Sequence, residues 1–209
     1  PEALSKLGYK HRGIFGKWHL GHNHTKWHPN NQGFTHFHGH YNGAIDYFTL
    51  SRENERDWHL NKKSNQETGY STDLIASAAS NFILKHSKEE EPFFCYVPFN
   101  SPHSPFQAPE KYIKKFQHLA GPNSKGKNKS LRQVVAAMVS CMDDGIGKIL
   151  KAIDTSGEAD NTIVWFFSDN GGIGGLQKNN LPLRGNKLDV WEGGVRVAAA
   201  IRWPNGGGP

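Results

Sequence analysis

The sequence has 209 residues, of which 36% are hydrophobic and 21% are charged, a composition typical of a globular protein and not of a disordered chain. This length suffices for one substantial core, so we expect residues 1–209 to form one domain or most of one. No apolar run is long enough for a transmembrane helix, and no signal-peptide core follows Pro1. Because the chain opens without Met, we expect it to start inside a fold, with any targeting segment upstream.

The charge balance is basic, with 25 Lys and Arg against 19 Asp and Glu, and a polyanionic partner is compatible with it. Zinc-finger spacings, RNP-type runs and long basic helices are absent from the sequence, which argues against nucleic acid. The densest basic cluster, Lys125–Lys129, has the composition of a solvated surface turn. Cys95 and Cys141 form no disulfide pattern, and we expect buried free thiols. The sequons at Asn23 and Asn128 would matter only in a secretory eukaryotic protein.

Along the chain, residues 7–16 have the pattern of a helix end that runs into a short strand. Residues 18–70 show no sustained periodicity, and such long segments in compact domains are usually functional. Helical spacing of apolar residues then predicts a helix that begins at Ser71 or Thr72 as its N-cap and ends near His86.

A second helix is predicted from about Leu131 to Ile153, closed by Ser156–Gly157. The continuously apolar runs 92–99 and 162–167 predict strands that are covered on both faces. Helices that alternate with such strands indicate an α/β fold with a largely parallel or mixed sheet, in which ligands bind beyond the carboxyl ends of the strands.

Unusual polar residues follow these strands. Lys17 and His19 would aim a cation and an imidazole to the same side if their segment is extended, although a surface lysine beside a loop histidine is an equal alternative. Asp169 and Asn170 offer oxygen ligands suited to Ca²⁺, unless Asn170–Gly171 forms a type I′ turn.

His103 lies between two prolines on a rigid loop, which suits a general acid, and an unengaged loop histidine is the alternative. Lys187, with Arg184 and the glycines at 193–194, could form a cationic cradle for a tetrahedral anion or a solvated basic turn. The histidines at 22, 24, 28, 36, 38 and 40 suggest zinc, but the sequence has no HExxH, so an irregular His-rich loop is the preferred interpretation.

The combination and order of these segments resemble the sulfatase family of the alkaline-phosphatase-like fold, and most of all the arylsulfatase B (N-acetylgalactosamine-4-sulfatase) type. The matching stretches are GKWHLG at 16–21, the QGF and aromatic-glycine pattern at 32–43, the run 92–112, the helix with Met142, Asp143 and Gly147, SDNGG at 168–172, and the run 181–197.

The resemblance implies a role for each polar residue. Lys17 would contact the sulfate and the catalytic aldehyde hydrate, His19 would help that hydrate to eliminate sulfate, and His103 would protonate the leaving oxygen. Asp169 and Asn170 would be two Ca²⁺ ligands, and Lys187 would be the second sulfate-binding lysine. The implied nucleophile is a formylglycine made from Cys or Ser in C/S-x-P/A-S-R.

That motif does not occur in the sequence, since neither Cys95 nor Cys141 has the required neighbours. We therefore expect an N-terminally truncated, inactive piece of the large sulfatase domain that also lacks the smaller C-terminal domain. The resemblance implies cleavage of a sulfated sugar or an aryl sulfate, outside the cytoplasm. A phosphoesterase of the same superfold and a non-catalytic binder of sulfated glycans are the alternatives.

Overall fold

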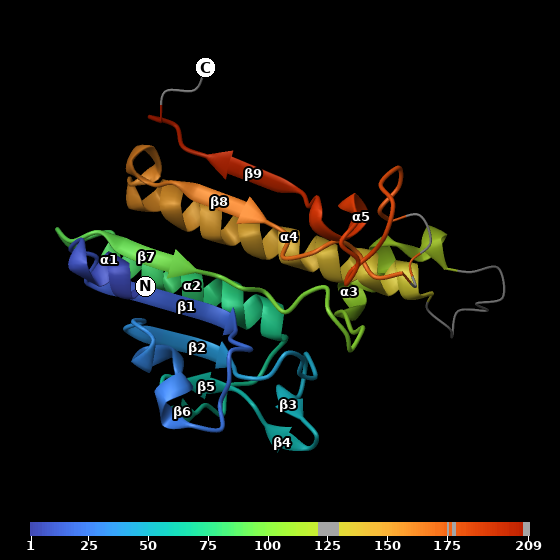
Figure 1. Cartoon of the computed structure of the whole chain (residues 1–209), viewed down its shortest axis with the longest axis horizontal. Coiled ribbons are helices and arrows are strands. Elements are labelled where there is room, and N and C mark those ends of the chain that lie inside the picture. Colours follow the sequence, from blue (N-terminus) through green and yellow to red (C-terminus); the bar gives the residue numbers. More distant parts are fainter. Residues whose placement is uncertain (121–129, 175, 177–178, 207–209) are drawn as a thin grey trace. The chain divides into compact units, whose positions relative to one another are not determined.

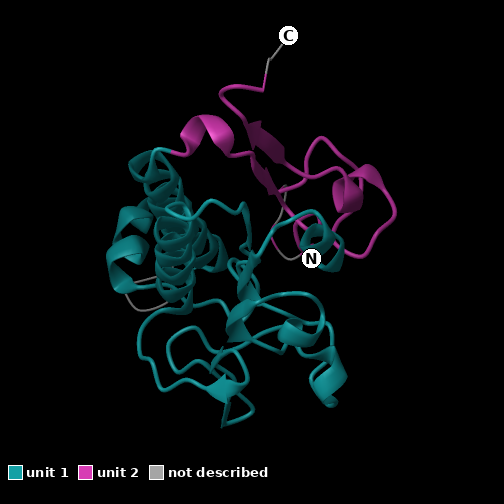
Figure 2. Cartoon of the chain, turned by 90° about the vertical axis from the view of Figure 1, so that its left-hand side faces the viewer, with its two compact units in different colours: residues 1–157 teal, residues 158–209 magenta. Residues whose placement is uncertain are grey.

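The computed structural model describes residues 1–120, 130–174, 176 and 179–206. The chain divides into two compact units, residues 1–157 (unit 1) and residues 158–209 (unit 2) (Figure 2). The predicted basic turn at Lys125–Lys129 and the sequon at Asn128 lie outside the described residues.

Unit 1 is built on a five-stranded mixed sheet with the strand order β6-β5-β2-β1-β7 (Figure 1). The central strands β1, β2 and β7 are parallel, whereas β5 and β6 are antiparallel additions at one side, so the expected mixed sheet is confirmed. A separate two-stranded sheet follows β2 in the chain. The strands are β1 (His11–Lys17), β2 (His36–His40), β3 (Ser51–Arg52), β4 (Glu55–Arg56), β5 (His59–Leu60), β6 (Lys63–Ser64) and β7 (Phe93–Tyr96).

The helices of unit 1 are α1 (Glu2–Lys6), α2 (Ser71–His86), α3 (Glu110–Lys115) and α4 (Leu131–Ser156), with short 3₁₀ turns at Thr25–Trp27, Pro29–Asn31 and Gln117–Leu119. The predicted extent of α2 is confirmed, but its N-cap is Tyr70. Ser71 and Thr72 are instead fully buried in the first turn. Helix α4 ends as predicted, at Gly157 in the left-handed conformation. No described helix is both long and apolar enough to cross a bilayer.

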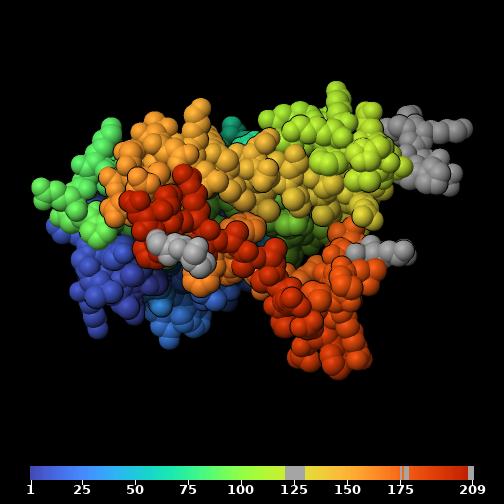
Figure 3. Space-filling model, turned by 90° about the horizontal axis from the view of Figure 1, so that it is seen from above, coloured from blue at the N-terminus to red at the C-terminus, as the bar shows by residue number. Residues whose placement is uncertain are grey.

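The main core lies between the sheet and α2, where Phe15, Trp58 and Ile75 are fully buried. Helix α4 packs along α2, and α3 packs in turn against α4. The side chains of α3 and α4 share one surface in the space-filling view (Figure 3). A second aromatic cluster contains Trp18 and Phe34. The segment 18–35, which had no recognisable periodicity, is therefore held partly by its aromatic side chains.

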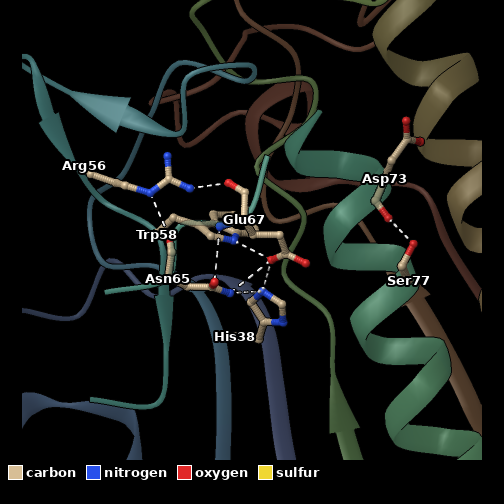
Figure 4. Close-up of polar contacts among 7 residues, drawn as sticks. All are labelled: His38, Arg56, Trp58, Asn65, Glu67, Asp73 and Ser77. Carbon is tan, nitrogen blue, oxygen red and sulfur yellow. Dashed lines mark hydrogen bonds and ion pairs between the residues drawn. The ribbon is translucent and has the colours of Figure 1, made fainter. Parts of the chain in front are cut away.

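A polar network around Glu67 fixes the chain that follows β2 (Figure 4). One carboxylate oxygen of Glu67 accepts hydrogen bonds from Trp58 Nε1 at 2.9 Å and from Asn65 Nδ2 at 3.1 Å, and it pairs with His38 Nε2 at 2.7 Å. Arg56 donates to the backbone carbonyls of Asn65 and Glu67. The irregular region is thus ordered by side chains and not by a regular ladder.

Unit 2 contains an antiparallel ribbon of β8 (Val164–Phe167) and β9 (Ala199–Arg202), the 3₁₀ turn Ala159–Asn161 and the short helix α5 (Glu192–Val195). The prediction of a strand is confirmed, but its expected burial is wrong, because Trp165 is 66% exposed and Phe167 is 56% exposed. A two-stranded ribbon presents both of its faces, so an apolar run alone does not determine whether they are covered.

Candidate functional site

Lys17 is the last residue of β1 and lies between two neighbouring segments. It is in register with His40 of β2, and its backbone N–H donates to the Pro98 carbonyl at 2.9 Å. The preceding Gly16 has φ +125°, and a Cβ there would overlap the same Pro98 carbonyl. Only glycine therefore permits the close approach that positions Lys17.

His19 lies where the chain turns out of the sheet. Its φ of 51° places it in the left-handed region, so the extended segment that would aim Lys17 and His19 to the same side is not formed. The backbone N–H of His19 donates to the Tyr41 carbonyl at 2.9 Å. Its imidazole ring lies against Gly43, where an added Cβ would be 2.5 Å from Cε1 of the ring.

His103 lies on the loop that follows β7. The buried hydroxyl of Tyr47 lies 2.7 Å from the Asn100 carbonyl oxygen and 2.8 Å from the His103 carbonyl oxygen, and His103 N–H donates to Asn100 at 2.9 Å. His103 Nδ1 is 2.8 Å from the Ser104 carbonyl oxygen, which can only accept. Nδ1 therefore carries the proton in this contact, and Nε2 is the nitrogen left for proton transfer.

These three residues lie at one edge of the unit 1 sheet. Strands β1, β2 and β7 are parallel, so their carboxyl ends meet at the same edge (Figure 1). Lys17 and His19 follow β1, and His103 follows β7. This edge is where ligands bind in open α/β sheets.

Two buried polar residues, His40 and Asp57, lie beside this edge. Burial lowers the pKa of His40 to about 4, with Asp57 and Asn42 opposing the shift and Lys17 and His19 adding to it. His40 Nδ1 donates to the Asn42 carbonyl at 2.8 Å, while Nε2 has no hydrogen-bond partner among the residues that the structure describes. His40 is thus a neutral imidazole in the register position beside Lys17.

Asp57 ties together the chain just beyond β2. Burial raises its pKa, but hydrogen bonds from His59, from the backbone of Tyr41 and Asn42 and from the Asn42 amide outweigh burial, and the net shift is strongly downward. Asp57 is therefore a carboxylate at neutral pH. The sequence carried no signal for this role.

In unit 2, Asp169 and Asn170 follow β8 after a single intervening residue, Ser168. The Asn170 amide donates to the Gly171 carbonyl at 2.9 Å, which leaves its Oδ1 as a potential ligand atom. Neither Asn170 nor Gly171 is among the described residues with positive φ, so the type I′ turn is excluded. Asp169 is exposed.

Lys187 contacts the same loop, because its backbone N–H donates to the Gly172 carbonyl at 2.9 Å. The side chain of Asn180 joins the two segments. Its Oδ1 accepts from Gly172 N–H at 3.0 Å, and its Nδ2 lies 3.1 Å from each of the Gly172 carbonyl, the Gly185 carbonyl and Asn186 Oδ1. Sequence reasoning missed Asn180, because an Asn in a turn-rich stretch carries no distinguishing pattern.

Close glycine contacts complete the unit 2 cluster. A Cβ at Gly171 would overlap the Gly193 carbonyl, and Gly193 N–H donates to the Arg184 carbonyl at 2.7 Å. The Arg184 guanidinium lies 3.7 Å from the centre of the Trp191 ring, a cation–π contact. Lys187 thus belongs to one hydrogen-bonded cluster with the loop after β8, while Arg184 is engaged with Trp191, and the anion cradle stays a prediction.

The six histidines of residues 22–40 have individual environments. His38 pairs with Glu67, His28 Nε2 contacts the Asn61 carbonyl at 3.1 Å, and His22 stacks near Tyr41. Burial lowers the pKa of His36 to about 4.

The predicted site residues therefore form two groups, each ordered within its own unit. Lys17, His19 and His103 lie at the sheet edge of unit 1. Asp169, Asn170 and Lys187 lie in loops of unit 2 that are joined by backbone hydrogen bonds and by close backbone contacts at glycines. The carboxylate of Asp169 and the amide oxygen of Asn170 are hard oxygen ligands that fit Ca²⁺, which takes about six to eight such ligands. The remaining ligands would have to come from other residues.

Sequence comparison with known proteins identifies sulfatases as similar to this chain. The sulfatase family model matches residues 1–209. Arylsulfatase J of Mus musculus is 32% identical over 212 residues, an alignment that covers 98% of this chain and 34% of that protein. N-acetylgalactosamine-6-sulfatase of Homo sapiens is 33% identical over 224 residues, with 98% of this chain and 39% of that protein covered. The chain thus spans little more than a third of these relatives.

Solved structures also resemble this chain in their fold. The crystal structure of Ps i-CgsB in complex with k-i-k-neocarrahexaose superposes with a TM-score of 0.85 and 31% identity, covering 97% of this chain and 46% of that one. BT4656 in complex with D-glucosamine-2-N,6-O-disulfate has a TM-score of 0.73 at 21% identity, over 98% of this chain and 55% of that one, and supports the fold. The expected alkaline-phosphatase-like sulfatase fold is confirmed.

Proposed function

Since the chain belongs to the sulfatase family, we propose that it forms part of the catalytic domain of a hydrolase that cleaves sulfate esters. The observation that carries this proposal is the placement of a lysine and two histidines at one carboxyl edge of the unit 1 sheet. Residues 1–209 would supply both sulfate-binding lysines, both acid–base histidines and two of the metal ligands.

The residues suit the chemistry of sulfate transfer. Lys17 and Lys187 would bind the anionic sulfate oxygens, and His103, with Nδ1 engaged by Ser104, would deliver the Nε2 proton to the departing oxygen. His19, backed by Gly43, would act as the base that releases sulfate. Bound Ca²⁺, held by Asp169 and Asn170 with further ligands, would add positive charge for the sulfate oxygens.

We place the nucleophile outside residues 1–209. Burial raises the pKa of Cys95 to about 12, and burial followed by the charge of Asp73 raises the pKa of Cys141 to about 12. Both thiols are therefore protonated and poor nucleophiles at neutral pH. A formylglycine made from an upstream Cys or Ser would supply the attacking hydrate, and residues 1–209 alone would be inactive.

We propose a sulfated carbohydrate as the substrate class, with aryl sulfates as accessible model substrates. The net charge of +6 favours anionic ligands. The relatives include N-acetylgalactosamine-6-sulfatase, and Ps i-CgsB is solved with a neocarrahexaose. A location outside the cytoplasm, either lysosomal, secreted or periplasmic, is part of the same proposal.

The test uses the complete protein that contains this chain, co-expressed with a formylglycine-generating enzyme and assayed with p-nitrocatechol sulfate. Lys17→Ala and His103→Ala should each lower kcat/KM by about 10² or more, because each removes a group that acts on the transition state. Full activity in both variants would refute the assigned roles.

The same preparation separates the alternatives. A phosphoesterase of this superfold would contain two transition-metal ions and would prefer a phosphate ester. A binder of sulfated glycans would retain its ligand without turnover, and its coding sequence would lack the C/S-x-P/A-S-R motif. Hydrolysis of the sulfate ester that requires the formylglycine-generating enzyme would exclude both.

A further inference from the structure

A compact cluster of His11, His86 and Glu89 lies at the amino end of the unit 1 sheet. His11 opens β1, His86 closes α2, and Glu89 lies in the turn between α2 and β7. Lys17 lies six residues further along β1, which at about 3.3 Å per residue separates this cluster from the candidate site by about 20 Å. None of the roles proposed above uses these three residues.

The three side chains converge. Glu89 Oε2 is 2.5 Å from His11 Nε2, and Glu89 Oε1 is 2.8 Å from His86 Nδ1. The two imidazole rings are stacked, with their centroids 3.9 Å apart. One ligand atom from each residue lies within 4.8 Å of the other two, and among the described residues this is the group of His, Cys, Asp and Glu that meets this condition.

The site is sheltered on the side of His86, which is only 8% exposed. The carboxylate of Glu89 faces both imidazole rings and places a negative charge between two nitrogen ligands. One divalent ion would contact both rings and the carboxylate.

The donor set identifies the class of metal. Two imidazole nitrogens and one carboxylate oxygen form a ligand set that Zn²⁺ accepts with water as a fourth ligand, and Ca²⁺ and Mg²⁺ prefer oxygen ligands alone. In a tetrahedral zinc site the ligand atoms are about 3.3 Å apart, so the two imidazole rings would have to turn out of their stacked arrangement for both nitrogens to face one ion. Lys85 adds an opposing positive charge near His86, while the nearby Lys10 is paired with Glu91.

We propose that His11, His86 and Glu89 bind one Zn²⁺ ion at the amino end of the sheet. The ion would join the first residue of β1 to the last residue of α2 and to the turn that leads into β7. A ligand that binds only the folded state stabilises it, so the site would reinforce the attachment of α2 to the sheet. The site uses neither of the oxygen ligands Asp169 and Asn170.

The experiment measures zinc bound per protein. The complete protein is equilibrated by dialysis with micromolar Zn²⁺ and excess Ca²⁺, which occupies oxygen-only sites, and its metals are counted by mass spectrometry. Glu89→Gln should bind one zinc ion fewer than the wild type, or bind it at least tenfold more weakly, because it removes the charged ligand. Glu90→Gln, the same change at the exposed neighbouring residue, should bind as the wild type does.

His86→Gln provides a second test, with His118→Gln at an exposed histidine as its control. Zinc should raise the melting temperature of the wild type and of both controls, and should leave Glu89→Gln and His86→Gln unchanged. If His86→Gln does not fold, Glu89→Gln decides, since its side chain lies on a surface turn. Equal zinc content in the wild type and Glu89→Gln, or no zinc in the wild type, would overturn the proposal.

Discussion

Gly43 lies directly against the imidazole ring of His19, and a Cβ at Gly43 would be 2.5 Å from Cε1 and 2.6 Å from Nε2. The ring therefore has a flat backbone surface behind it. Since His19 also has a left-handed backbone conformation, both its main chain and its side chain are fixed by neighbours that the linear sequence does not reveal.

Gly43→Ala should displace the His19 ring and lower kcat/KM for a sulfate ester by about 10- to 100-fold, because small displacements of acid–base groups are costly. The control is Gly147→Ala in helix α4, where an added Cβ would meet no atom of the described residues within 4 Å. That variant should keep full activity and gain about 0.5–1 kcal/mol of stability from helix propensity. Equal activity in the two variants would show that the contact with Gly43 does not position His19.

Tyr47→Phe should loosen the loop that carries His103, because the Tyr47 hydroxyl lies within hydrogen-bond distance of the carbonyls of Asn100 and His103. We expect a loss of about 1–2 kcal/mol in unfolding free energy, together with reduced activity. Tyr70→Phe is the matched control, since the Tyr70 ring lies 5.4 Å from that of Tyr47 and its hydroxyl donates to Gln107. Denaturant unfolding and kinetics on both variants separate lost stability from lost positioning, and a similar fall in activity for both would contradict the assignment.

Asn180→Asp should disrupt the unit 2 cluster, because it replaces an amide donor with an anionic oxygen that faces the Gly172 and Gly185 carbonyls. Its neighbour gives the control, since Asn179 makes one described side-chain hydrogen bond, to the Ile173 carbonyl at 3.2 Å. Amide hydrogen exchange at Lys187, whose N–H donates to the Gly172 carbonyl, should accelerate in Asn180→Asp and remain slow in Asn179→Asp. Unchanged exchange in both variants would show that Asn180 does not hold these two loop segments together.

His40 should make the protein less stable in mild acid. Burial lowers its folded-state pKa to about 4, whereas the unfolded chain takes up this proton near the ordinary value of about 6.5. The unfolded state therefore binds more protons between these values, and the contribution of His40 is present above about pH 6.5 and lost as pH falls towards 4. His36 acts in the same window.

Urea unfolding between about pH 7 and pH 5 measures this loss, which cannot exceed about 1.4 kcal/mol per pH unit for one group. His40→Gln should have a shallower dependence of stability on pH than the wild type. His118→Gln, at an exposed histidine, should have the wild-type dependence. A pH dependence in His40→Gln as steep as in the wild type would mean that another group is responsible.

The elements that were predictable from sequence are those set by local patterns. The extent of helix α2 was predicted because its apolar spacing is regular, although its N-cap is Tyr70 and not Ser71 or Thr72. The end of α4 was predicted because a left-handed glycine terminates it. The burial of β8 was predicted wrongly, since an apolar run does not report what packs on it. Asn180 was missed because its contacts join segments that only folding brings together. The roles assigned to Lys17 and Lys187 rest on family resemblance and stay predictions.

The glycine contacts described above also bear on how far this scaffold can be diversified. A side chain at Gly16 would overlap Pro98, one at Gly39 would overlap Gly16, and one at Gly171 would overlap Gly193. Each of these three glycines permits two backbones to touch beside a candidate residue. A mutational library should therefore hold positions 16, 39 and 171 invariant and randomise the exposed residues near His22 and His24, where new specificity can be sought without disturbing the frame.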